Sequence, residues 1–334
     1  MVWSHHLKDD ALLDVVSGMI AENERSGSIV LPNLRESDTL VGASDISGDH
    51  KTSRFVVFSF LLAEKASCHV WTQRRRMIRA NLLPTGRRLG YKELNDCFVR
   101  NSLASILDAA NTINGILVAF VVEKSIPSIF SSGPPIDLRA FEFAKLTDRY
   151  PKNSERLLRQ FCLTGLFIGS LSRQSQDVYW FFDEDEIFAN ADLKTSAMNV
   201  AADLWGSLIP HKMGRVRLLT TQADNGDRAI EDVTALPDLA GGALADGLMA
   251  LQTSEMDEVR RVLTPLPRAS KTKTNYILSW LSNNAAPLKK MVIMILPGSD
   301  ASRLRTVLLF LHRTDDAIWE PGSEWRGSIF GGVP

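Results

Sequence analysis

Four short acidic segments stand at the edges of apolar runs, and their carboxylates are the residues of this chain best suited to chemistry. They contain Asp45 in VGASDISGD, Glu93 in YKELND, Asp183 directly after VYWFF, and Asp238 in ALPDLAGGALAD. A carboxylate that follows a buried strand is held at the edge of a sheet. Several such groups brought together repel one another unless a hard cation such as Mg²⁺ or Mn²⁺ neutralises them. The pattern predicts a metal-dependent nuclease.

Each acid also has a purely structural interpretation. Asp45 lies between two serines before a glycine, as a turn aspartate does. Asp183 opens the run DEDE, and such runs commonly start solvated helices, where the helix dipole favours negative charge. Asp185 in the same run is an alternative ligand, and Asp232 is a spare acid near Asp238. Glu93 could instead cap the helix that follows it.

A basic segment between Trp71 and Lys92 offers a second kind of chemistry. It reads WTQRRRMIRANLLPTGRRLGYK and contains no acidic residue. Its cations are Arg74, Arg75, Arg76, Arg79, Arg87, Arg88 and Lys92. The planar guanidinium suits phosphate, several together bind nucleic acid without regard to sequence, and Trp71 and Tyr91 could stack on bases. The alternative is an exposed basic loop that pairs with acidic helices elsewhere in the chain.

Composition excludes several classes of function. The formal net charge of −1 leaves nucleic-acid binding to a local patch. The three cysteines form no CxxC pair, which argues against a zinc site. The amphipathic start is more charged than we expect of a signal peptide, and no apolar run approaches the roughly 20 residues that span a bilayer. We therefore expect a cytoplasmic protein that does not enter the membrane.

Hydrophobic periodicity predicts an α/β fold. The spacing predicts a helix over 8–24, a hairpin of strands at 39–47 and 54–63, the start of a third strand in CHVW at 68–71, a helix at 97–112 and a strand at 115–124. It then predicts a helix at 153–170, a strand at 177–182, a helix after the acidic run, a strand at 214–221 and a helix at 236–251 with a proline near its start. The apolar runs MVIMIL and TVLLFL add two strands.

The predicted elements fall into three regions. Residues 1–36 form an N-terminal helical segment, 37–252 form the core, and 253–334 form a C-terminal extension packed on that core. The stretch TPLPRASKTKT at 264–274 is the best candidate for an exposed connection. Its cations Arg268, Lys271 and Lys273 are interpreted as part of a solvated linker.

Three motifs in order carry a family resemblance. ASDISGD, VYWFFDEDEI and ALPDLAGGALAD resemble the motifs of a bacterial ribonuclease H-like family of unknown function, over roughly residues 38–250. Members of that family open on a strand ending in YxDESGD and close on a helix of the form LQxADLxAGA. Ile46 stands where the family has glutamate. Because alternate strand positions point to opposite faces, we expect Ile46 to face the core and Asp45 the site.

The resemblance implies a ribonuclease H-like mixed β-sheet flanked by helices, and hydrolysis of DNA or RNA by two metal ions, Mg²⁺ or Mn²⁺. Asp45 would bridge both ions, Asp183 would bind one, Asp238 would complete the set, and Glu93 would be a fourth ligand. Ile46 favours an alternative, in which the chain is a catalytically degenerate binding or assembly module of a mobile-element or defence system. A further alternative is an activity that requires a protein partner.

Overall fold

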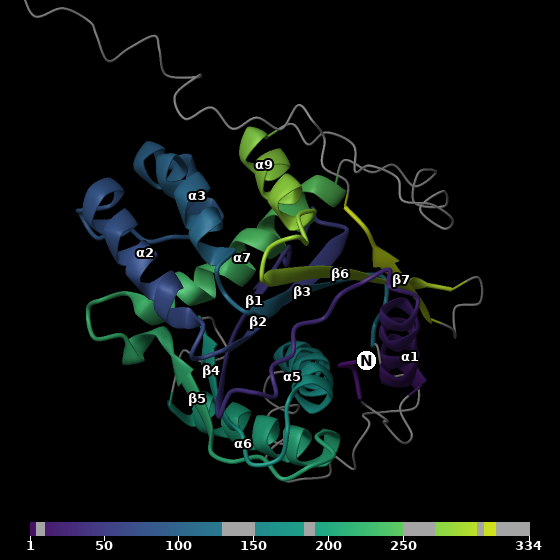
Figure 1. Ribbon diagram of the computed structural model, residues 1–334. Coiled ribbons are helices and arrows are strands. Elements are labelled where there is room, and N and C mark those ends of the chain that lie inside the picture. Colours follow the sequence, from purple (N-terminus) through teal and green to yellow (C-terminus); the bar gives the residue numbers. More distant parts are fainter. Residues whose placement is uncertain (5–10, 129–150, 184–190, 250–270, 299–303, 312–334) are drawn as a thin grey trace, which may run out of the picture.

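One mixed sheet of seven strands organises the protein. The computed structural model describes residues 1–4, 11–128, 151–183, 191–249, 271–298 and 304–311. The strands are β1 (Thr39–Ser47), β2 (Phe55–Glu64), β3 (Gly115–Glu123), β4 (Asp177–Phe182), β5 (Val216–Thr220), β6 (Leu288–Pro297) and β7 (Leu304–Leu309). Their order across the sheet is β5-β4-β1-β2-β3-β6-β7. Figure 1 shows the sheet between two groups of helices.

The pairing of the strands combines an antiparallel centre with parallel flanks. β1, β2 and β3 are successive antiparallel neighbours. On one side β4 runs parallel to β1 and β5 parallel to β4. On the other side β6 runs parallel to β3, and β7 is antiparallel to β6. Because helices cover both faces, β2 and β3 are apolar along nearly their whole length.

The helices divide between the two faces of the sheet (Figure 1). The first face is covered by α1 (Ala11–Arg25), α5 (Pro151–Leu171) and α6 (Ala191–Leu208). The second is covered by α2 (Cys68–Leu82), α3 (Cys97–Ala110), α7 (Ala229–Leu248) and α9 (Thr272–Leu281). Two short 3₁₀ turns, η1 (Lys92–Asn95) and η2 (Thr221–Ala223), lie in the connections. Helix α7 packs directly on β1 and β2.

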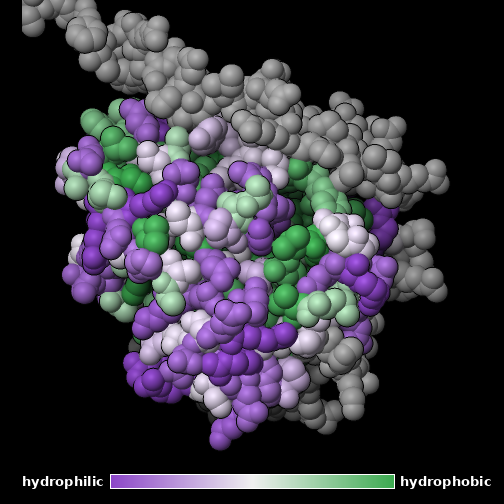
Figure 2. All heavy atoms as spheres, viewed as in Figure 1, coloured by the Kyte–Doolittle hydropathy of each residue, from purple (hydrophilic) through white to green (hydrophobic). Residues whose placement is uncertain are grey.

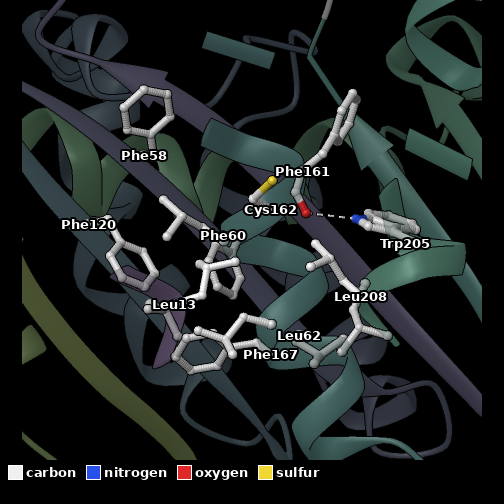
Figure 3. Close-up of a cluster of buried hydrophobic side chains, with 14 of the residues drawn as sticks. Leu13, Phe58, Phe60, Leu62, Phe120, Phe161, Cys162, Phe167, Trp205 and Leu208 are labelled. Atoms are coloured by element: carbon white, nitrogen blue, oxygen red, sulfur yellow. Dashed lines mark hydrogen bonds between the residues drawn. The ribbon is translucent and has the colours of Figure 1, made fainter. Parts of the chain in front are cut away.

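Aromatic side chains fill the core on the first face. Phe167 of α5 meets Phe60 of β2 edge to face, with ring centroids 5.2 Å apart. Trp205 of α6 contacts the ring of Phe161 and donates its indole N–H to the Phe161 carbonyl at 3.0 Å, the bond drawn in Figure 3. The buried indole is therefore both packed and hydrogen-bonded, as a buried tryptophan requires.

The outer surface is mixed in character. On the face shown in Figure 2, hydrophilic residues predominate at the bottom of the view, and hydrophobic residues surface in smaller areas above them. Among the described residues, no helix is long and apolar enough to cross a membrane.

Most predicted elements are confirmed, with two corrections. CHVW at 68–71 is the first turn of α2 and not a strand; Trp71 and Arg75, four residues apart, share the buried face of that helix. Four residues are too few to distinguish a helical from a strand period. Helix α7 begins at Ala229, earlier than expected, so Pro237 lies inside it and not near its start. The predicted two final strands are β6 and β7, which complete the same sheet.

Candidate functional site

Two strands bring Asp45 and Asp183 to one edge of the sheet. Ser44 of β1 pairs with Phe182 of β4 in parallel register, so the next residue of each strand emerges at the same edge. Those residues are Asp45 and Asp183. Ile46 packs against the hydrophobic core of the first face, whereas Asp45 faces the side of α7, as expected from strand alternation.

Helix α7 brings Asp238 to the same place because two glycines allow a close approach. A Cβ atom on Gly241 would lie 2.9 Å from the hydroxyl oxygens of both Ser47 and Ser59. A Cβ on Gly242 would lie 2.3 Å from the Tyr91 ring. The small residues after Asp238 therefore let the helix pack on the sheet, as the sequence predicted.

The end of the basic segment is tied to Asp238. The Tyr91 backbone N–H donates to Asp238 Oδ2 at 2.7 Å. Gly90 must be a glycine for this contact, because its Cβ would lie 2.8 Å from the same oxygen. Glu93 follows in η1 and lines the same cavity.

The four predicted acids that the structure describes meet around one open cavity of about 750 Å³. The acids that line it are Asp45, Asp49, Glu93, Asp183, Glu231, Asp238 and Asp246; the lysines and arginine are Arg88, Lys92, Lys271 and Lys273. Carboxylates therefore cluster near the ends of the strands, and lysine and arginine side chains line the same cavity. The alternative ligand Asp185 lies outside the described residues.

Burial and mutual repulsion perturb the central acids. Burial, together with the negative charges of Asp238 and Asp183, raises the pKa of Asp45 to about 8, although Ser47 donates a hydrogen bond to Asp45 at 2.8 Å. Burial also raises the pKa of Asp238, against the opposing hydrogen bond from Tyr91. Among the described residues, neither acid forms an ion pair with a lysine or arginine. Within the part of the chain that the structure describes, each one therefore lacks a direct positive partner.

Asp183 differs, because Arg88 forms an ion pair with its carboxylate. The positive charges of Lys92 and Arg88 partly oppose the rise in the pKa of Asp238. Arg88 and Lys92 are exposed and line the cavity, so both can contact an anion that enters it.

The described acids do not form a complete metal-binding group. Among the residues that the structure describes, no three His, Cys, Asp or Glu side chains gather as a metal-binding group. The donor chemistry nevertheless fits a hard divalent cation: Asp45 and Asp238 are carboxylates that repel each other, and oxygen donors of this kind bind Mg²⁺ and Mn²⁺.

Two arginines predicted to bind nucleic acid have a structural role instead. Arg75 is fully buried and donates to Asp232 at 3.1 Å, as well as pairing with Asp227. Arg79 donates to Asp232 at 2.6 Å. Because Arg75 and Asp232 have no exposed surface, neither can contact a nucleic acid or serve as a spare metal ligand.

The remaining arginines of the segment are more exposed and also pair with acids. Arg74 pairs with Asp108, Arg76 with Asp227 and Arg87 with Asp96. This pairing is the alternative that the sequence left open, although the arginines at 74–79 lie on a helix and not in a loop. None of these three side chains lines the cavity.

The two aromatic residues expected to stack on bases are buried. Trp71 is 2% exposed and Tyr91 is 7% exposed, so neither presents a free ring face. The Tyr91 hydroxyl donates to Asp246 at 2.6 Å, and Lys273 lies over its ring at 4.4 Å. Tyr91 is therefore a packing residue beneath the cavity.

Sequence reasoning missed Asp246, Lys271 and Lys273 as residues of the site. Asp246 follows Asp238 by about two turns of α7, and this helical spacing was the available signal. The two lysines belong to the start of α9 and line the cavity, whereas they were expected in a solvated linker. Arg268 of the same group lies outside the described residues.

Comparisons with known proteins give no relative from which a function could be transferred: no family model, curated protein or solved structure matches the chain.

Proposed function

We propose that this protein is a metal-dependent nuclease with a ribonuclease H-like core. The observation that carries the proposal is the meeting of Asp45, Asp183 and Asp238 around one cavity, from two strand ends and a late helix. Asp45 and Asp238 have no direct positive partner among the described residues. The pKa of each is raised by burial, and that of Asp45 also by the negative charge of Asp238. A divalent cation would neutralise these carboxylates.

The order of elements supports the ribonuclease H-like assignment. Three antiparallel strands come first, then helices alternate with the parallel strands β4 and β5, and α7 follows. The three motifs on which the resemblance rests fall at the end of β1, after β4 and on α7. Residues from distant parts of the sequence thus meet around one cavity, which supports a shared metal site.

The residues around the cavity have distinct roles in this proposal. Asp45 and Asp238 would hold the metal, with Asp183 and Glu93 as further ligands. The bound metal would activate water and stabilise the leaving oxygen. Arg88 and Lys92 would bind phosphate oxygens and place the scissile bond over the acids. The acidic residues alone would repel a polyanion, so these cations are needed for binding.

A second candidate is a binding or assembly module that keeps the fold without catalysis. The Arg88–Asp183 ion pair favours it, because a guanidinium already occupies one predicted ligand. The lack of a three-residue metal group among the described side chains, and Ile46 at the glutamate position, point the same way. DNA or RNA would still contact Arg88 and Lys92 in such a module.

A cleavage assay separates the two candidates. Single- and double-stranded DNA and RNA are incubated with the protein and Mg²⁺ or Mn²⁺, beside an EDTA control. The variants are Asp45→Asn, Asp183→Asn and Asp238→Asn, which keep the side-chain shape and remove the charge. Asp203→Asn is the matched control, since Asp203 is exposed on α6 and does not line the cavity.

Each outcome of the assay decides between the candidates. Metal-dependent cleavage that is lost in the three site variants and kept in Asp203→Asn supports the nuclease. Binding of DNA or RNA without cleavage, with either Mg²⁺ or Mn²⁺, supports the binding module. Cleavage that survives Asp45→Asn and Asp238→Asn together would remove the proposed site, whatever its products.

A further inference from the structure

Two lysines at the start of α9 form a positive cluster on the cavity, and Lys271 lies at a distance from the central acids. Lys271 donates to Asp246 at 2.5 Å, and Asp246 lies about two helical turns after Asp238 on α7. At a rise of 1.5 Å per residue, the two aspartates are about 12 Å apart along the helix axis. Lys271 therefore lies well away from the acids proposed to hold the metal.

Lys273 is held rigidly next to Lys271. It donates to the Tyr91 carbonyl at 2.9 Å and to Asn95 Oδ1 at 3.0 Å, and its ammonium lies over the Tyr91 ring. Both of these acceptors are neutral oxygens. The Lys273 amino group is thus held in a fixed place without a direct carboxylate partner among the described residues.

The charges around the cluster repel one another. Burial lowers the pKa of Lys273, and the positive charges of Lys271 and Arg100 lower it further, although Asp246 and Asp238 oppose this. Lys271 remains exposed while bonded to Asp246. An anion bound between Lys271 and Lys273 would relieve their repulsion and gain two charge-assisted contacts.

We infer that Lys271 and Lys273 form a second phosphate-binding subsite, which holds a phosphate of the substrate other than the one that is cleaved. The inference rests on the proposed function for the position of the scissile phosphate. It identifies the substrate as a chain with several phosphates, an oligonucleotide, and not a small phosphodiester. The strand would pass from Arg88 and Lys92 across the acids towards α9.

The test measures binding without catalysis. The affinity for fluorescently labelled single-stranded DNA and RNA oligonucleotides is measured by anisotropy in EDTA over a series of salt concentrations. The variant Lys271→Gln/Lys273→Gln removes both charges and keeps hydrogen-bonding side chains, whereas Lys271→Arg/Lys273→Arg keeps the charges. Lys212→Gln is the matched control, because Lys212 is exposed and lies outside the cavity. Circular dichroism checks that each variant is folded.

The salt dependence gives a quantitative expectation. Each lost phosphate contact lowers the slope of log affinity against log salt by about 0.7 on a single strand, so the Gln pair should lower it by about 1.4. The Arg pair and Lys212→Gln should keep the wild-type slope. A folded Gln pair with the wild-type slope and affinity would overturn the inference, as would a wild type that binds neither oligonucleotide. A difference between the DNA and RNA results shows which polymer the subsite prefers.

A second substrate separates this inference from the proposed activity. Bis(p-nitrophenyl) phosphate contains one phosphate and cannot place a second one between the lysines. With Mn²⁺, the Gln pair should lose more of its kcat/KM for oligonucleotides than of its kcat/KM for this substrate. If the wild type hydrolyses neither substrate but binds oligonucleotides through the lysines, the nuclease proposal fails and the subsite stands. If it hydrolyses both and the Gln pair matches it throughout, the subsite fails.

Discussion

The backbone N–H of Tyr91 donates to Asp238 Oδ2 at 2.7 Å, which joins the end of the basic segment to helix α7. The bond orients one carboxylate of the candidate site and also fixes the chain that carries Arg88 and Lys92. The Tyr91 ring packs so closely on Gly242 that no side chain fits between them. The position of Asp238 and of the chain that carries Arg88 and Lys92 therefore depends on one packing contact.

Gly242→Ala should disturb that contact. Its Cβ would lie 2.3 Å from the Tyr91 ring, so the ring must move and carry the Asp238 hydrogen bond with it. We expect a loss of about 1–3 kcal/mol of unfolding free energy, as for other overpacked sites, together with loss of metal-dependent cleavage. Chemical denaturation and the cleavage assay measure the two effects. Gly206→Ala on α6 is the control, since its Cβ meets nothing within 4 Å; it should gain up to about 1 kcal/mol. Equal stability of both variants would show that Tyr91 does not pack as described.

Asp45 should make the metal-free protein less stable as the pH rises. Its pKa is about 8 in the folded protein against the ordinary 3.8, so the folded state binds more protons than the unfolded state between these values. The free energy of unfolding should therefore fall as pH rises from about 4 to 8. Asp45→Asn stays neutral, and its melting temperature at pH 8 in EDTA should exceed that of the wild type by a few degrees. The two proteins should converge as the pH falls to about 4, and a wild type that becomes more stable than Asp45→Asn towards pH 8 would contradict the assignment.

The buried arginine network should dominate the stability of the second face. Arg75→Ala leaves the fully buried Asp232 without one of its two cations and should cost about 3–5 kcal/mol in urea denaturation. Arg74→Ala removes only an exposed pair with Asp108 and should cost less than about 1 kcal/mol. In Arg75→Met/Arg79→Met/Asp232→Leu the buried carboxylate is removed along with both of its cations. We expect this triple variant to recover much of the loss; a triple variant as unstable as Arg75→Ala would refute the explanation.

The local elements and the central acids were predictable from sequence because their signals are short-range. The apolar runs of β1 and β4 each end at an aspartate, and the small residues after Asp238 indicated a helix that approaches the sheet closely. These features need only the period of the chain and the chemistry of its residues. The meeting of the three acids then follows from parallel strands and one late helix.

Pairings between distant residues could not be read from the same patterns. Arg75 and Asp232 are 157 positions apart, and an arginine run has the same composition whether it binds phosphate or a buried carboxylate. Tyr91 likewise resembles a stacking residue until the fold buries it beneath Lys273. The starting point of α7 was misplaced because Pro237 suggests a first turn, whereas the helix accommodates it in its interior.

Lys290 on β6 should give a second pH signature of opposite sign. Burial, with a smaller contribution from Lys289, lowers its pKa to about 7; its ammonium donates to Asn111 Oδ1 and to the Asn283 carbonyl, each at 2.8 Å. Between pH 7 and the ordinary value of 10.5, the unfolded state binds more protons, so the Lys290 contribution to stability should increase with pH. The variant Lys290→Met lacks this pH-dependent contribution to stability. The stability of the wild type relative to Lys290→Met should therefore rise from pH 7 to pH 10 in urea denaturation, and a constant difference would contradict the lowered pKa.

The place of β3 in the sheet has a consequence for the assembly of the chain. One edge of β3 pairs with β2, the preceding strand in the sequence, but the other pairs with β6, which lies roughly half the chain length further on. During synthesis, this second edge stays open until β6 has been made. An open strand as apolar as GILVAFVVE invites pairing with other molecules. The sheet that positions the site thus creates a long interval in which the nascent chain is vulnerable to aggregation.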